Sequence, residues 1–154
     1  MPQVTVILPT WNRAKWLKTS IESVLSQTFQ DFELIVVDDA STDSTGKILE
    51  SYSGKIRTIL LPENLGVSAA RNTAIVQSDS KWIAFLDSDD YWHAEKLEKQ
   101  IKQTRLCPEY QIHFTDEIWI RNGIRVNPKN KHRKREGWIF KPSLALCLMA
   151  PSTV

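Results

Sequence analysis

The sequence predicts an α/β fold, a sandwich of helices and a mainly parallel sheet. Two observations predict it. Short apolar runs rich in β-branched residues alternate with amphipathic stretches of about a dozen residues, which is the pattern of successive strand–helix–strand units. Three of the apolar runs also end abruptly in polar residues, where buried parallel strands would reach one edge of a sheet.

The first strand–helix–strand unit is predicted at residues 4–37. Val4–Leu8 is an apolar run that Pro9 stops, and Leu34–Val37 is a second run that ends at Asp38. Between them, apolar residues recur every three or four positions over Ala14–Gln27, which predicts an amphipathic helix. We therefore expect two buried parallel strands joined by this helix.

The same pattern repeats as far as residue 106. It predicts a helix capped by Ser41–Thr45 and ending at Tyr52, a strand at Ile56–Leu61, a helix at Val67–Gln77, a strand at Trp82–Leu86 and a helix at Ala94–Leu106. Beyond Pro108 the pattern changes. Gln111–Thr115 predicts another strand, and Ile118–Val126 alternates around Asn122 and Gly123, a strong hairpin signal. We expect these antiparallel strands to join the sheet.

The last residues predict a domain that continues past them. Leu144–Met149 is an apolar, helix-like stretch that leads into a strand-like Ser152–Val154, and nothing in the sequence covers either segment. We therefore expect the fold to be truncated at the C-terminus.

Composition limits the classes of function. The 154 residues suffice for one domain, which would bury about 70% of the surface that the unfolded chain exposes. The formal net charge of +2 gives no reason to expect a nucleic-acid partner. Cys107 and Cys147 lack metal-type spacing and are expected to be reduced core thiols in a cytoplasmic protein, with a disulfide as the alternative. We expect neither a secretion signal nor a membrane span, which needs ~20 apolar residues.

Lys129–Arg135 is the one concentration of basic residues. Because no aromatic residues are interspersed, a solvated loop is the preferred interpretation. Contact with a phosphate or an anionic lipid, and with it peripheral association with a membrane, is the alternative.

The most informative segment is Phe85–Trp92, where an apolar strand leads into three carboxylates within four positions. Hard divalent ions such as Mg²⁺ take oxygen ligands, and Asp87 and Asp89, two residues apart on a turn, are able to face one ion. The alternative is that these carboxylates cap the following helix, whose first turn favours negative charge. Because Pro9–Asn12 and Asp38–Asp39 end other strands, three polar clusters are expected to converge on one crevice.

Five segments carry a family resemblance, and they are Val6–Arg13, Ser23–Phe29, Asp31–Asp43, Asn64–Asn72 and Phe85–Asp90. Together and in this order they resemble the nucleotide-sugar-binding half of inverting family 2 glycosyltransferases with the GT-A fold. The similarity covers residues 1–92 and is loose beyond Glu109. It implies one domain at 1–154, with a nucleotide-sugar-binding half at 1–92 and the incomplete start of an acceptor-side half at 109–154.

The resemblance implies contacts with a nucleotide sugar for a set of polar and turn residues, namely Pro9, Thr10, Asn12, Asp38, Asp39, Asn64, Arg71, Asp87 and Ser88. Within this set Asp39 would accept a hydrogen bond from uracil, and the Arg71 guanidinium would pair with phosphate oxygens or stack on a base. Asp89 would be the direct ligand of Mn²⁺ or Mg²⁺, with Asp87 as a second ligand. Each residue also has a structural alternative, such as a turn, a cap or an exposed helix position.

The implied activity is metal-dependent, inverting transfer of a sugar from a nucleoside diphosphate sugar, by resemblance a UDP-sugar, to a glycan or lipid-linked acceptor. Such a transfer needs a general base. The resemblance implies that this base comes from an acidic motif later in the domain, which we expect beyond Val154. Asp116 on the acceptor side is an alternative, but Asp116 and Glu117 are better explained as the start of a hairpin strand. One alternative is a non-catalytic nucleotide-sugar-binding fragment. A nucleotidyltransferase is disfavoured because Pro9–Arg13 contains no glycine. The expected location is the cytoplasm, with the inner face of the membrane as the alternative.

Overall fold

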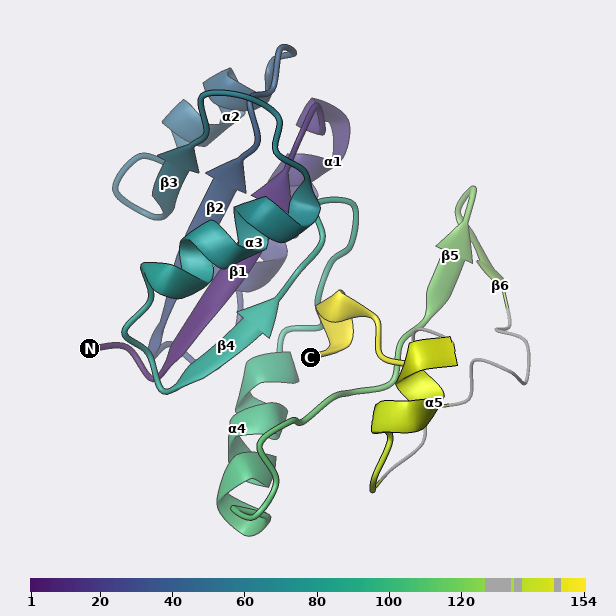
Figure 1. The fold of residues 1–154 in the computed structure, drawn as a ribbon. Coiled ribbons are helices and arrows are strands. Elements are labelled where there is room, and N and C mark those ends of the chain that lie inside the picture. Colours follow the sequence, from purple (N-terminus) through teal and green to yellow (C-terminus); the bar gives the residue numbers. More distant parts are fainter. Residues whose placement is uncertain (127–133, 135–136, 146–147) are drawn as a thin grey trace.

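The computed structural model describes residues 1–126, 134, 137–145 and 148–154. Its centre is a parallel sheet of four strands in the order β3-β2-β1-β4 (Figure 1). The strands are β1 (Val4–Thr10), β2 (Phe32–Asp38), β3 (Arg57–Leu60) and β4 (Trp82–Phe85). The predicted α/β architecture with a mainly parallel sheet is therefore confirmed.

Helices cover both faces of the sheet. They are α1 (Ala14–Leu25), α2 (Thr45–Ser51), α3 (Val67–Val76) and α4 (Lys96–Leu106). Figure 1 shows α3 in front of the sheet and α1 behind it. Because side chains alternate along a strand, Val6 and Leu8 pack with α1, α2 and α4, whereas Ile7 packs with α3.

The small side chains of α3 bring this helix close to the sheet. Ala70 and Ala74 are completely buried against Ile7, Ile35 and Val37. Bulkier residues at these two positions would hold the helix further from the strands. The close approach matters because the N-terminal end of α3 lies at the edge of the sheet where the polar clusters converge.

The predicted order of strands and helices is confirmed up to residue 106, and the bounds differ by at most two residues. The prediction that Pro9 stops the first strand is wrong, because β1 continues through Pro9 to Thr10. Helix α4 begins at Lys96, with Glu95 as its N-cap, rather than at Ala94. The carboxylates at positions 87–90 therefore lie before residues 91–94, which separate them from the N-cap, and they do not cap the helix.

Two predictions for the later segment are wrong. Gln111–Thr115 is not a strand. The hairpin does form, as β5 (Trp119–Arg121) and β6 (Ile124–Val126), but it makes a separate two-stranded sheet. The edge of β4 is instead met by the end of the chain, where the N–H of Phe85 donates to the carbonyl of Val154 at 3.4 Å.

The predicted C-terminal strand is also wrong, whereas truncation of the fold stays a prediction. Helix α5 covers Phe140–Ala145, and residues 152–154 form no strand, because a 3₁₀ helix, η2 (Pro151–Thr153), begins at Pro151. Ser152 and Thr153 are buried rather than uncovered. Of the basic segment 129–135 only Lys134 is described, and Cys147 also lies outside the described residues, whereas Cys107 is a free thiol.

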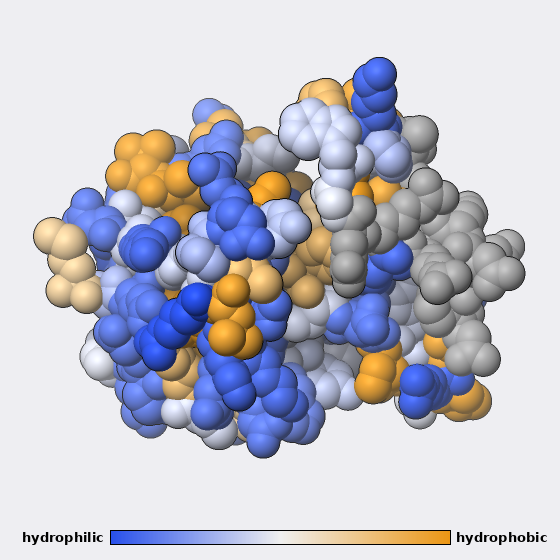
Figure 2. Space-filling view, turned by 90° about the horizontal axis from the view of Figure 1, so that it is seen from below, coloured by the Kyte–Doolittle hydropathy of each residue, from blue (hydrophilic) through white to orange (hydrophobic). Residues whose placement is uncertain are grey.

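The surface seen from below Figure 1, the side on which α4 lies, is largely hydrophilic, with apolar residues in small groups (Figure 2). None of the helices in the described residues has the length and apolar character needed to cross a bilayer.

Candidate functional site

A pocket of about 320 Å³ opens at the carboxyl edge of the sheet. Strand β1 lies between β2 and β4, so the chain reverses its direction across the sheet at this point, which is where open α/β sheets bind ligands. The residues that line it come from the ends of three strands and from the start of α3: Pro9, Thr10, Trp11, Arg13, Asp39, Val67, Ala70, Arg71, Asp87, Ser88 and Asp89. The three polar clusters predicted from the sequence thus meet in one cavity.

Asp39 links the end of β2 to the beginning of α3. Its two carboxylate oxygens accept the backbone N–H groups of Leu65 and Gly66, each at 2.8 Å. Its own N–H donates to the carbonyl of Thr10 at 2.9 Å. Gly66 has φ 87° and ψ 160°, a backbone conformation that essentially only glycine adopts. This buried carboxylate therefore fixes one wall of the pocket.

Arg71 forms an ion pair with Asp87 in the lining of the pocket, with 2.5 Å between Nη2 and Oδ1. Its guanidinium also lies 5.9 Å from the centroid of the Phe85 ring. Among the described residues, the buried Nε of Arg71 and the buried hydroxyl of Thr10 have no hydrogen-bond partner. Both residues line the pocket, although these two atoms are themselves buried.

The acidic turn, residues 87–90, follows β4. The N–H of Asp90 donates to the carbonyl of Asp87 at 3.0 Å. The pKa of Asp90 is raised, mainly because burial desolvates its carboxyl group. The charges of Asp89 and Asp87 raise this pKa further, whereas the hydrogen bond from Ser152 lowers it. Asp89 is exposed at the pocket, and within the described residues its carboxylate has no ion pair or hydrogen bond.

The oxygen donors of this turn fit a hard divalent ion. In the described part of the chain, no three His, Cys, Asp or Glu residues are grouped closely enough to enclose a metal. Mg²⁺ and Mn²⁺ sites, however, take only one or two protein carboxylates when water and phosphate oxygens fill the remaining positions. The Asp89 carboxylate and the Oδ2 atom of Asp87 are the donors that remain for such a site.

Three predicted site residues do not line the pocket but support it. Asn12, at φ 51°, uses its side-chain oxygen to accept the N–H groups of Thr42 and Asp43 at 2.8 and 3.3 Å. The Asp38 carboxylate accepts the N–H of Ser41 at 3.1 Å. Asn64 donates from Nδ2 to the carbonyl of Asp39 at 3.4 Å. These contacts are structural, and binding of a nucleotide sugar by the three residues stays a prediction.

Four pocket residues were not predicted as site residues: Trp11, Arg13, Val67 and Ala70. Trp11 and Arg13 directly follow the strand end at Thr10, so their position was the available signal. Val67 and Ala70 lie one turn or less before Arg71 on α3, and nothing in their residue types indicated a site.

Of the later acidic pair, Asp116 and Glu117, the structure shows side-chain partners for Glu117. The Glu117 carboxylate accepts a hydrogen bond from Nζ of Lys134 at 3.2 Å and another from Nε1 of Trp119 at 2.9 Å. Asp116 is exposed and lies outside the pocket lining. Neither residue is placed as a general base by these contacts.

The family model of glycosyl transferase family 2 matches residues 5–139. The chain belongs to this family. The resemblance seen in the sequence is thereby confirmed over most of the described residues. A similar protein is WfgD of Escherichia coli, named as a UDP-Glc:α-D-GlcNAc-diphosphoundecaprenol β-1,3-glucosyltransferase, which is 44% identical over 99 residues. The match covers 64% of this chain but only 39% of WfgD.

Solved structures share the fold of this family 2 chain. TarS of S. aureus, residues 1–349 in complex with UDP, superposes with a TM-score of 0.64 at 35% identity, over 68% of this chain and 32% of that one. The mannosyltransferase PcManGT of Pyrobaculum calidifontis, in complex with GDP-Man and Mn²⁺, gives 0.61 at 28% identity, over 67% and 32%. The chain thus spans well under half the length of these relatives.

Proposed function

We propose that this chain is the donor-binding part of a metal-dependent, inverting glycosyltransferase that transfers a sugar from a UDP-sugar to a glycan or lipid-linked acceptor. The observation that carries the proposal is the pocket itself, where Asp39, Arg71 and the acidic turn meet at the reversal point of the sheet. The relatives support it in two ways: WfgD is named for a UDP-Glc donor and a lipid-linked acceptor, and TarS has been solved with UDP.

The residues divide the work as follows. The uracil would lie beside Pro9 and Thr10 and hydrogen-bond to the Asp39 carboxylate, whose oxygens each retain a lone pair beyond the backbone bonds already made. The diphosphate would lie near Arg71, whose guanidinium suits phosphate oxygens. Asp89, with Asp87, would hold Mn²⁺ or Mg²⁺, which when bound stabilises the negative charge on the departing diphosphate.

UDP is preferred over GDP because the structure with UDP is the more similar of the two in sequence, at 35% against 28% identity. The proposed acceptor follows the name of WfgD. In this proposal residues 1–92 form the nucleotide-sugar-binding half, which holds the metal, the nucleotide and the sugar.

A second function is favoured by one observation. Among the described residues, the Glu117 carboxylate is paired with Lys134 and Trp119, and Asp116 does not line the pocket, so neither is available there as a general base. The chain by itself would then bind the donor without transferring the sugar. Incubation with UDP-glucose distinguishes the two functions. Release of UDP would show hydrolysis or transfer, whereas binding without release of UDP would show the non-catalytic function.

Calorimetric titration of UDP into the chain tests the binding proposal. We expect heat of binding in the presence of Mn²⁺ and a large loss of affinity in EDTA. Asp89→Asn is expected to bind as weakly with Mn²⁺ as the unaltered chain does in EDTA. Asp79→Asn, an exposed aspartate outside the pocket lining, is the matched control and should retain binding. UDP binding that ignores both the metal and Asp89 would overturn the proposed metal site.

A further inference from the structure

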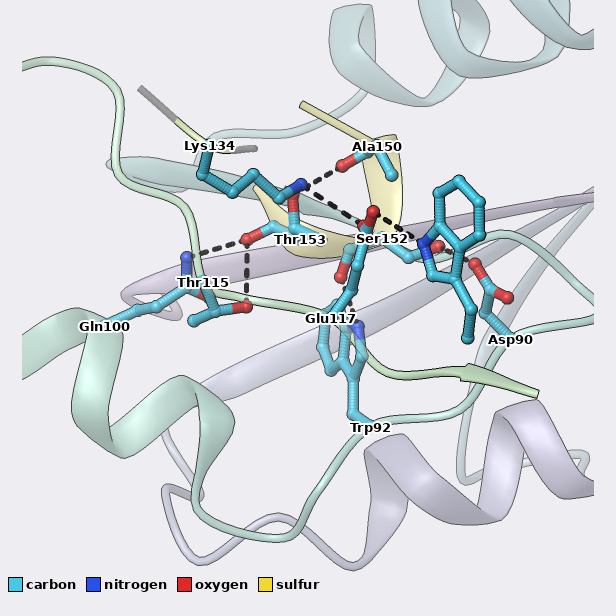
Figure 3. A network of polar contacts seen from close by, with 10 residues as sticks. Asp90, Trp92, Gln100, Thr115, Glu117, Lys134, Ala150, Ser152 and Thr153 are labelled. Atoms are coloured by element: carbon cyan, nitrogen blue, oxygen red, sulfur yellow. Dashed lines mark hydrogen bonds and ion pairs between the residues drawn. The ribbon is translucent and has the colours of Figure 1, made fainter. Parts of the chain in front are cut away.

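The 3₁₀ helix η2 lies against the acidic turn, and its Ser152 makes the contact (Figure 3). Ser152 is only 8% exposed. Its hydroxyl oxygen accepts the N–H of Asp87 at 3.0 Å and donates to Oδ2 of Asp90 at 2.6 Å. Its carbonyl accepts the indole N–H of Trp92 at 2.8 Å. One buried serine therefore bonds to both ends of the turn that carries Asp89.

The same turn is also held by α1. The hydroxyl of Ser20, which is 1% exposed, lies 3.0 Å from the carbonyl oxygen of Ser88 and 2.7 Å from that of Asp90. Contacts from two elements far apart in the sequence thus fix the backbone of the turn. Of the carboxylates in it, that of Asp87 pairs with Arg71 and that of Asp90 with Ser152, which leaves the Asp89 carboxylate toward the pocket.

We propose that Ser152 is a positioning residue for the metal site: its paired hydrogen bonds to Asp87 and Asp90 set the geometry of the turn from which Asp89 binds the ion. The inference rests on the proposed function, because it presupposes that Asp89 is a metal ligand. The physical reason is that Mg²⁺ and Mn²⁺ require near-ideal octahedral geometry. Partners that orient the ligands typically change metal affinity by 10- to 100-fold, as an order of magnitude.

The neighbouring residue provides a matched control. Thr153 is 3% exposed in the same 3₁₀ helix, but its hydroxyl donates to the carbonyl of Ala150, within the same turn, at 2.7 Å. Thr153→Val removes a buried hydroxyl and keeps the shape of the side chain. It should therefore destabilise the fold without changing the acidic turn, whereas Ser152→Ala removes both hydrogen bonds to the turn.

The experiment titrates Mn²⁺ into the UDP-saturated chain and, separately, UDP into the chain in EDTA, and it follows unfolding in urea. For Ser152→Ala we expect the Kd for Mn²⁺ to rise about 10- to 100-fold, while UDP binding in EDTA stays within about twofold. Thr153→Val should keep the Mn²⁺ affinity of the unaltered chain. A general loss of stability would weaken Mn²⁺ binding and UDP binding in EDTA alike. A weaker Mn²⁺ affinity with unchanged UDP binding in EDTA therefore indicates a specific effect on the metal site.

An unchanged Mn²⁺ affinity in Ser152→Ala would overturn the positioning role, and so would an equal loss in Thr153→Val. If the unaltered chain shows no Mn²⁺-dependent binding, the proposed function itself fails. If Ser152→Ala does not fold, Ser152→Cys replaces the hydroxyl by a thiol, a weak donor and acceptor, and its Kd for Mn²⁺ is expected to be severalfold higher than that of the unaltered chain. An unchanged Kd in Ser152→Cys would then overturn the role.

Discussion

At the scale of single residues, Asp39 combines a structural and a binding task. Its carboxylate accepts two backbone N–H groups and is 3% exposed, yet it also lines the pocket. The two tasks are compatible because an ionised carboxylate has lone pairs for about four hydrogen bonds. A residue type that accepts fewer bonds would lose one of them.

Asp39→Asn tests this double task. The amide presents one acceptor oxygen, so either Leu65 or Gly66 would have its N–H facing an NH₂ group, and we expect about 1–3 kcal/mol less free energy of unfolding together with a loss of UDP affinity. Urea unfolding and calorimetry measure the two effects. Asp79→Asn should change neither. Full stability in Asp39→Asn would contradict the assigned hydrogen bonds.

The sequence predicts residue types at strand ends well and their partners poorly. Pro9, Asp39 and Asp87 could be placed at one edge because strands are recognised from local periodicity. The pairing of Asp87 with Arg71 joins residues 16 positions apart, and Asn12 bonds to Thr42, 30 positions away. Such contacts depend on how the elements pack, so the supporting role of Asn12 could not be distinguished from ligand binding.

At the scale of elements, the start of α3 depends on Gly66. Its φ of 87° and ψ of 160° suit glycine, and its N–H donates to Asp39. Periodicity predicted α3 almost to the residue, because Ala70 and Ala74 give it a buried face. Periodicity failed for residues 111–115 and 152–154, where the chain end rather than a new strand meets the edge of β4.

Gly66→Ala is expected to lower the free energy of unfolding by about 1–3 kcal/mol, the cost of a Cβ in this backbone region. No atom lies within 4 Å of the position that the Cβ would occupy, so the cost is conformational and not steric crowding. Gly46→Ala is the control with the opposite sign. It lies inside α2 with the same open space, and we expect a gain of up to about 1 kcal/mol from helix propensity. Urea unfolding of both variants gives the comparison.

At the scale of the whole molecule, a lysine is buried where α4, β4 and η2 meet. Lys96 is 7% exposed, its Nζ lies 4.1 Å from the centroid of the Trp92 ring, and it donates to Gln100 and to the carbonyl of Val154. Burial lowers the pKa of Lys96 to about 7. The unfolded chain therefore holds a proton between about pH 7 and 10.5 that the folded chain has released.

The contribution of Lys96 to stability should accordingly increase with pH over that range. Lys96→Met keeps the apolar stem and removes the charge, so its free energy of unfolding should exceed that of the unaltered chain most at pH 7 and the excess should shrink toward pH 10. Urea unfolding at several pH values measures this difference. Lys99→Met, an exposed lysine paired with Glu95, should show no such trend. A difference independent of pH for Lys96→Met would mean that the buried amine stays charged.

The position of β1 between β2 and β4 has a consequence for folding kinetics. Val4 pairs with Phe32 on one side and with Trp82 on the other. The loop between Val4 and Trp82 is the longer of the two, and it closes more slowly because the chain loses more entropy when it closes. The β1–β2 pair is therefore expected to form before β4 docks. The acidic turn joins the fold together with β4, so a partly folded chain should not bind UDP. The time at which UDP binding appears during refolding would therefore mark the completion of the sheet.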